Sequence, residues 1–239
     1  VDRSVSGLIV QQQCVGPLHC PLSNYSIIAH SMYNDKLGTI SALGEKPFIG
    51  IISTEKMVRM AVGELLTNII GGVIPSIKHI KCLGNWMWPN SFKEEQYNLL
   101  IAVKALNKIL IELGLAIIGG KDSLSMSVKI NDNYYIKSPK NFVITGIAEI
   151  PNFNNRIQSY FLNNNSNILH IDLGYNKFRL GGSIYSIVTN SEPGNYEQTP
   201  DFNNVNNFNK IFKNIQELIS DNIILSCHDI SDGGLITTL

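Results

Sequence analysis

The chain has 239 residues, of which 44% are apolar and 16% charged, and its 19 basic residues balance its 19 acidic ones. A formal charge of zero argues against a nucleic-acid groove or an anionic membrane surface as the main partner, because both require clustered positive charge. No apolar run reaches the roughly 18 residues of a membrane span, so none is expected.

Two features of the sequence predict a cytoplasmic piece of a longer protein. It begins at Val1 without a methionine or a basic-then-apolar signal, and it stops where a helix is predicted to begin, within Gly233–Leu239. The four cysteines show no CxxC spacing, which predicts reduced thiols at Cys14, Cys20, Cys82 and Cys227.

The first half of the chain predicts two strands and two long helices. Short β-branched or aromatic runs bounded by Gly and Pro predict strands at Ser4–Val10 and Tyr25–Ser31. Apolar residues recur at helical spacing over Lys56–Ile70 and over Glu94–Leu113, and a glycine stop follows each run. These two segments are therefore predicted to be helices.

The middle of the chain predicts two more strands and a boundary. Leu115–Ile118 is predicted to be a buried strand that leads into Gly119–Ser123, and Phe142–Ile150 is predicted to be a further strand. Pro151–Ser166 is polar, rich in Asn and without period, so it is the best candidate for a boundary between lobes.

The last part of the chain predicts a second lobe. Its predicted elements are a strand at Ile168–Leu173, a short helix or strand at Gly182–Val188, a helix at Val205–Ser220 and a strand at Ile223–Cys227. Strands and helices alternate along the chain, so the fold class is predicted as α/β to α+β. We place an N-terminal lobe at residues 1–155 and a C-terminal lobe at residues 164–239.

Glu64 and Asn68 form the first polar pair of interest. They lie four residues apart in a predicted helix, so they share one face of it. The positions around them are nearly all apolar, and a buried charge must find a partner. The pair either forms a buried hydrogen-bond network or a solvated stripe, or it offers two oxygen ligands to a hard cation such as Mg²⁺.

A second polar cluster, His228–Gly234, follows the last predicted strand. Asp229 and Asp232 flank the hydroxyl of Ser231, and a glycine pair lets the backbone pass close to a ligand. Ligands of α/β proteins gather at the carboxyl ends of strands, which favours a binding site here. An Asx turn followed by a helix cap explains the same residues.

The segment Gly119–Ser123 is the third candidate. Its backbone N–H groups can cradle a phosphate while Lys121 supplies positive charge. The spacing is not that of a Walker A loop. A turn between two strands, with an exposed lysine, is the alternative.

Six motifs follow one another along the chain: Asp2–Gly7, Gln11–Pro17, Ala61–Asn68, Gly84–Trp88, Gly119–Met126 and His228–Gly234. In wording and order they closely resemble the large, single-chain form of phosphoribosylformylglycinamidine synthase. The resemblance runs from residue 2 to the last residue and corresponds to the second of two related synthetase halves in that family.

This resemblance implies a fold like that of aminoimidazole ribonucleotide synthetase, with an N-terminal lobe that contributes strands to a shared barrel and a C-terminal α+β lobe. It implies an ATP-dependent amidotransferase of purine biosynthesis, in which ATP phosphorylates the amide of formylglycinamide ribonucleotide and glutamine-derived ammonia displaces the phosphate to give the amidine. The implied partners are a sister synthetase half and a glutaminase domain of the parent chain.

The resemblance also implies roles for single residues. The family's magnesium ligands fall on Glu64, Asn68 and Asp229, and its ATP or ADP contacts fall on Ser23 and Ser231. These positions include members of the first two polar clusters, so the clusters are expected to meet at one ion.

One position departs from the family's pattern. Asn24 stands where the family has Asp, so this ligand keeps an oxygen but loses a negative charge, which leaves the number of bound ions open. Lys121 and His228 are the candidates for direct roles in catalysis. We expect Lys121 to face phosphate charge and His228 to hydrogen-bond substrate rather than act as a general base.

Three interpretations stay open from the sequence. The chain is a catalytic half, or a half that holds Mg²⁺ and nucleotide permanently as a structural element, or a superfamily relative such as a thiamine-monophosphate or selenophosphate kinase-like protein. No glutaminase nucleophile can be assigned, so the isolated piece is expected to be inactive alone. It is also expected to be poorly soluble, because strands meant for a shared barrel would have open edges.

Overall fold

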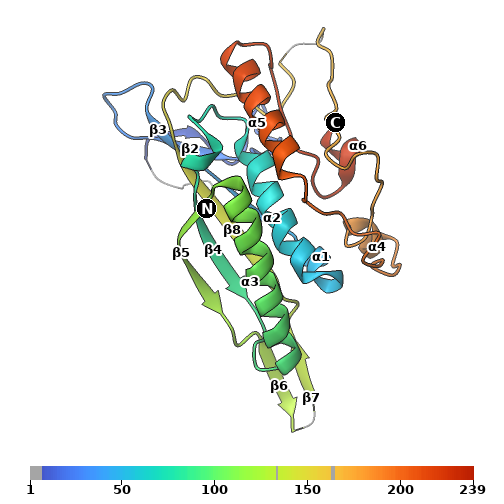
Figure 1. The fold of residues 1–239 in the computed structure, drawn as a ribbon. Helices are drawn as coiled ribbons and strands as arrows, with labels where there is room; N and C mark the ends of the chain where they lie inside the picture. The colour runs from blue at the N-terminus through green and yellow to red at the C-terminus, as the bar shows by residue number, and fades with distance from the viewer. Residues whose placement is uncertain (1–6, 133, 163–164) are drawn as a thin grey trace.

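The computed structural model describes residues 7–132, 134–162 and 165–239. Its centre is a six-stranded sheet in the order β1-β2-β3-β8-β4-β5 (Figure 1). The strands are β1 (Ile9–Gln11), β2 (Ser26–Ala29), β3 (Gly38–Glu45), β4 (Lys81–Met87), β5 (Ala116–Ser123) and β8 (Asn141–Ile150). Neighbours pair antiparallel, except for the parallel pair β4–β5. β3 and β4 both run antiparallel to β8, and β5 runs parallel to β4, so the carboxyl ends of β3, β4 and β5 lie at the same end of the sheet.

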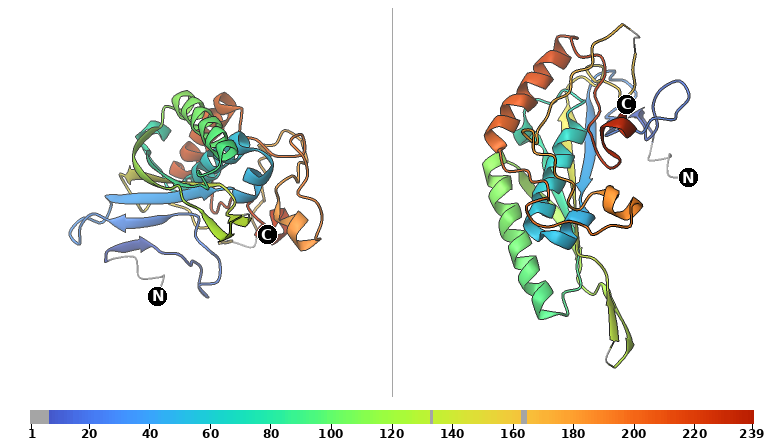
Figure 2. Two further views of the ribbon diagram at one scale, coloured as in Figure 1. Left: turned by 90° about the horizontal axis from the view of Figure 1, so that it is seen from below. Right: turned by 90° about the vertical axis from the view of Figure 1, so that its right-hand side faces the viewer.

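Helices cover one face of this sheet. α2 (Thr54–Ile69) lies against β3 and β8, and α3 (Lys93–Leu113) packs beside it. α5 (Val205–Ser220) packs against α3, and the short α1 (Pro47–Ile52) precedes α2. Figure 2 shows α2, α3 and α5 on the same side of the strands.

Buried apolar side chains hold α2 on the sheet. Leu65 of α2, Ile40 of β3 and Ile144 of β8 are all fully buried. Burial of each such side chain contributes roughly 1.5–3 kcal/mol. Gly44 permits the close approach, because a Cβ at this position would lie 2.1 Å from the carbonyl oxygen of Ala61.

The long helices begin and end where local chemistry directs them. The Ser53 hydroxyl caps α2 by accepting the backbone N–H of Lys56 at 3.3 Å. α3 ends at Gly114, whose φ of 72° lets its N–H return to carbonyls of the last turn. The predicted helices at Lys56–Ile70 and Glu94–Leu113 are confirmed.

The other described elements are smaller. A hairpin of β6 (Ser127–Asn131) and β7 (Tyr134–Lys137) projects beyond the end of the sheet (Figure 1). The rest are η1 (Ile77–His79), α4 (Ile184–Val188) and α6 (Gly234–Thr238). Within the ranges that the structure describes, no helix has both the length and the apolarity to cross a membrane.

Most of the predicted elements are confirmed. β2 lies inside the strand predicted at Tyr25–Ser31, and β8 matches the strand predicted at Phe142–Ile150. α5 coincides with the helix predicted at Val205–Ser220, and α4 is the short helix inside Gly182–Val188. β1 overlaps only the end of the strand predicted at Ser4–Val10. The start of that strand, and the motif Asp2–Gly7 apart from Gly7, lie outside the described residues.

Two strand predictions are wrong. Ile168–Leu173 and Ile223–Cys227 form no strand, and Ser226 makes only an isolated bridge to Gln158. Ile168 is 65% exposed, so its segment, although apolar in composition, has no sheet to join within the described residues. Apolar runs become strands only where a neighbouring strand supplies hydrogen bonds.

β5 also differs from the predicted buried strand. It continues from Ala116 through Ser123, so Gly119–Ser123 is a strand and forms neither a phosphate loop nor a turn. Among the described strands it lies at the edge of the sheet and pairs only with β4, and Ile118 is 63% exposed.

Candidate functional site

The end of β3 has a free edge. β2 pairs with β3 only as far as Ser41, whereas β8 accompanies it to Glu45. Two side chains of α2 satisfy the backbone groups left over. Glu64 Oε2 accepts the N–H of Glu45 at 2.7 Å, and Asn68 Nδ2 donates to the carbonyl of Leu43 at 2.9 Å. The pair therefore forms a hydrogen-bond network, which is one of the interpretations of its spacing.

Glu64 also contacts the loop before α6. Ser231 Oγ donates to Glu64 Oε1 at 3.0 Å, across a sequence separation of 167. Lys46 Nζ lies 2.5 Å from the same carboxylate oxygen and 3.5 Å from Ser231 Oγ. Lys46 is not among the residues singled out from the sequence. It directly follows β3, a strand that the sequence did not predict.

Asp229 forms a second contact, two residues along the chain from Ser231. Asn24 Nδ2 donates to Asp229 Oδ1 at 3.0 Å, and His228 Nδ1 lies 3.2 Å from the same oxygen. The hydrogen bond to Asp229 raises the pKa of His228 above its ordinary value, although burial acts in the opposite direction. Asn24 presents its amide nitrogen to Asp229, so its oxygen faces away from this carboxylate.

A cavity of about 280 Å³ opens beside Glu64 at the carboxyl end of β3. Lys46, Asn68, Asp232 and Gly182 line it together with Glu64. It thus joins residues of α2 to residues far along the chain. Its volume lies just below the usual range of ligand pockets, roughly 300–1,000 Å³, which suits a compact polar group.

Two predicted ligand-binding residues have local partners outside this lining. Ser23 Oγ donates to the carbonyl of Tyr25 at 2.5 Å and accepts from Gln11 Nε2 at 2.9 Å. Lys121 Nζ donates to Ser123 Oγ at 2.8 Å on the exposed edge strand. The roles of Ser23 and Lys121 toward a nucleotide stay predictions.

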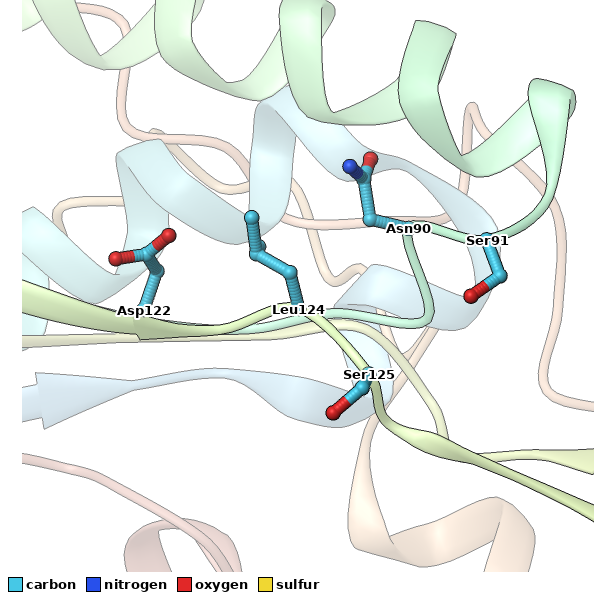
Figure 3. Close-up of a pocket in the computed structure, with 5 residues that line it drawn as sticks. All are labelled: Asn90, Ser91, Asp122, Leu124 and Ser125. Atoms are coloured by element: carbon cyan, nitrogen blue, oxygen red, sulfur yellow. The ribbon is translucent and has the colours of Figure 1, made fainter.

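A second hollow lies at the carboxyl ends of β4 and β5 (Figure 3). Its volume is about 420 Å³, and its lining consists of Asn90, Ser91, Asp122, Leu124 and Ser125. Asn90 Oδ1 is buried and has no hydrogen-bond partner among the described residues. The hollow and the Glu64 cavity therefore lie at the same end of the sheet, where β3, β4 and β5 finish.

By residue type, the side chains around Glu64 suit a hard cation such as Mg²⁺, although Lys46 Nζ holds Glu64 Oε1 in this structure. They combine carboxylate, carboxamide and hydroxyl oxygens, and Mg²⁺ is commonly bound by one or two carboxylates together with water and phosphate. No group of three or more His, Cys, Asp and Glu side chains comes together in the part of the chain that the structure describes. A cation held by Glu64 and Asp229 would therefore need further oxygen atoms from neutral side chains, from water and from the phosphates of a bound nucleotide.

Comparison with known proteins places the chain in a family. The family of FGAR-AT PurM_N-like domains matches residues 1–149. Over its whole length the chain is 38% identical to a probable phosphoribosylformylglycinamidine synthase, chloroplastic/mitochondrial, of Arabidopsis thaliana. It is 41% identical to a probable phosphoribosylformylglycinamidine synthase of Caenorhabditis elegans and 35% identical to the synthase of Homo sapiens. It spans 17%, 19% and 18% of these relatives, respectively.

A solved structure supports the fold. PurL of Thermotoga maritima complexed with FGAR superposes with a TM-score of 0.61, covering 86% of this chain and 31% of that chain. The two sequences are 9% identical over this match, so the likeness concerns the fold. It confirms the predicted fold class. The chain belongs to the family of FGAR-AT PurM_N-like domains, and its curated relatives are phosphoribosylformylglycinamidine synthases.

Proposed function

We propose that this chain supplies a pocket for magnesium and ATP to a phosphoribosylformylglycinamidine synthase. That enzyme is an ATP-dependent C–N ligase that converts formylglycinamide ribonucleotide to formylglycinamidine ribonucleotide with glutamine-derived ammonia. The observation that carries the proposal is the 3.0 Å hydrogen bond between Ser231 and Glu64, because it unites two distant polar motifs at one cavity. The names of relatives that are 35% to 41% identical support the same activity.

Glu64, Asn68 and Asp229 are the proposed magnesium ligands, with Asn24 as a weaker fourth. Magnesium would neutralise phosphate charge during phosphoryl transfer, which depends mainly on positioning and electrostatics. Glu64 is well placed to position a ligand, because the N–H of Glu45 fixes the direction of its carboxylate.

The remaining candidates are proposed to contact nucleotide or substrate. Ser231 reaches the cavity through Glu64, whereas Ser23 would first have to leave the carbonyl of Tyr25. His228 lies beside Asp229 and is proposed to hydrogen-bond substrate. Lys121 is proposed to face phosphate, with weaker support, because its ammonium contacts a neighbour on its own strand.

A second candidate function is favoured by one contact. Asn24 stands in place of a family carboxylate, and its amide nitrogen donates to Asp229 Oδ1. An amide carries no charge to offset a cation, as expected of a site that has drifted from catalysis, and in the alternative function this half holds magnesium and nucleotide as a structural element. The exchange of labelled ATP separates the two functions: exchange at the turnover rate supports catalysis, and retention over many turnovers supports the structural role.

The proposal includes partners and a compartment. A sister synthetase half would cover the sheet face away from α2, where Leu43 is 51% exposed, and a glutaminase domain would supply ammonia. Cys14, Cys20, Cys82 and Cys227 are all free, which suits the reducing cytoplasm.

Calorimetric titration of the full-length protein with ATP, with and without Mg²⁺, tests the pocket. Glu64→Gln keeps an oxygen for the N–H of Glu45 but removes the charge, so the Mg²⁺-dependent affinity for ATP should fall by at least about tenfold. Glu217→Gln is the matched control, because Glu217 lies on the exposed side of α5 with its side chain 60% exposed. Equal affinities of the two variants would contradict the proposal.

A further inference from the structure

The Glu64 cavity contains a positive charge that the proposed function does not use. Lys46 follows β3 directly and precedes α1, and its Nζ lies 2.5 Å from Glu64 Oε1. The side chains of Lys46 and Glu64 are only 16% and 13% exposed. Ser231 Oγ contacts both groups, at 3.0 Å from Glu64 Oε1 and 3.5 Å from Lys46 Nζ.

This arrangement conflicts with a second cation on the same carboxylate. An ammonium and a divalent ion repel strongly when both are close and partly shielded from water. Glu64 Oε2 already accepts the N–H of Glu45 at 2.7 Å. Glu64 therefore has no carboxylate oxygen free of protein contacts while Lys46 holds Oε1.

We propose that Lys46 is an exchangeable internal cation that neutralises Glu64 until the phosphates of a nucleotide draw its ammonium away. This inference rests on the nucleotide-binding function proposed above and adds a positioning residue to it. A lysine suits the role because its charge sits at the end of a flexible four-carbon stem. Lys46 thereby makes the affinity of the site for a divalent ion depend on the presence of nucleotide.

The test uses Mn²⁺ as the probe, with free Mn²⁺ measured by electron paramagnetic resonance in the full-length protein. The wild type should bind Mn²⁺ weakly alone and more tightly with ATP. Lys46→Met should bind Mn²⁺ alone about tenfold more tightly, and the enhancement by ATP should shrink, because coupling between two ligands is reciprocal. A merely structural Lys46 would change binding in the other direction, since its loss would loosen the cavity. The Mn²⁺ chelated by ATP in protein-free solution is subtracted, and the variants are compared with one another so that Mn²⁺ sites away from Lys46 cancel.

Three further variants complete the test. Lys46→Gln should repeat the result of Lys46→Met, and it replaces that variant if the latter fails to fold. Lys46→Arg keeps the charge and should behave as the wild type. Lys213→Met, on the exposed side of α5, controls for the loss of one positive charge.

Two outcomes overturn the inference in distinguishable ways. If the wild type binds Mn²⁺ with ATP, but both neutral variants bind Mn²⁺ alone no more tightly than it does, only the role of Lys46 fails. If the wild type binds no Mn²⁺ even with ATP, the proposed nucleotide function fails and the role of Lys46 fails with it.

Discussion

The part of the chain that ends at Ile150 and the stretch that precedes α5 are held in different ways. In the first part, α2 and the sheet bury side chains completely, Leu65 and Ile144 among them. In the stretch before α5, Leu169 is 78% exposed and Phe178 is 93% exposed. The first part has its own apolar core, whereas the second is held in place by its contacts with the first.

Polar contacts attach the second stretch to α2. Arg59 forms a two-point ion pair with Asp201, at 2.7 and 2.9 Å. Lys56 Nζ donates to the carbonyls of Tyr196 and Thr199 at 2.6 and 3.2 Å. The Glu64 cavity is lined by residues from both parts, with Glu64 and Asn68 on α2 and Gly182 and Asp232 from later in the chain. Apolar packing holds the α2 side of the cavity, whereas hydrogen bonds attach the stretch before α5.

The largest expected effect on stability comes from disrupting the apolar core of the first part. Leu65→Ala should lower the free energy of unfolding by about 2–5 kcal/mol, because it leaves a cavity between α2 and the sheet. Denaturant titration measures the change. Leu18→Ala is the control, since Leu18 is 84% exposed and its loss should cost less than about 0.5 kcal/mol. Similar costs for both variants would contradict a core centred on α2.

A smaller effect is expected from breaking the polar attachment. Asp201→Asn weakens the ion pair with Arg59 and should ease local opening by about 1.5–3 kcal/mol, the usual contribution of hydrogen bonds to charged groups. Hydrogen exchange should speed up around residues 193–201 while the buried face of α2 keeps its protection.

The control for this variant is another ion pair. Lys213 and Glu217 lie 3.5 Å apart and are 77% and 60% exposed, so Glu217→Gln should change exchange by less than about 0.5 kcal/mol. Uniform loss of protection across α2 in Asp201→Asn would show that the two stretches unfold as one unit and would remove the contrast between them.

The smallest effect concerns pH. The pKa of His228 is raised above its ordinary 6.5, mainly by the hydrogen bond to Asp229. The stabilisation from charged His228 is therefore fully present below the unfolded pKa and is lost as pH rises through the folded pKa. The stability difference between wild type and His228→Gln, measured by denaturant titration from acidic to mildly alkaline pH, should shrink as pH rises. A difference that grows with pH would have the wrong sign.

The sequence predicted the elements whose own residues determine them. α2, α3 and α5 each bury one face, so helical spacing alone identified them. The strand predicted at Ile168–Leu173 is wrong because a strand also needs a neighbouring strand, and a local sequence pattern cannot show whether one is present. The prediction that β5 is buried is wrong for a related reason. Whether a strand lies at the edge or in the centre of a sheet depends on the order of the strands, which the residues of β5 alone do not reveal.

The candidate site shows the same division. Glu64 and Ser231 could be singled out by residue type in polar clusters, and a hydrogen bond joins these two residues, whereas a shared ion stays a prediction. Lys46 and Asn90 could not be singled out, because a lone lysine or asparagine has no informative spacing. Their importance comes from partners, or a missing partner, that only the folded chain reveals.

Glu64 and Asn68 line the cavity and also close the free edge of β3. A change that removes either side chain exposes a backbone amide or carbonyl of that strand, whatever the state of the pocket. Natural selection for folding alone would therefore keep both residues in a copy that had ceased to turn over. The presence of Glu64 and Asn68 is therefore evidence of an intact strand end, and evidence of chemistry has to come from ligand binding.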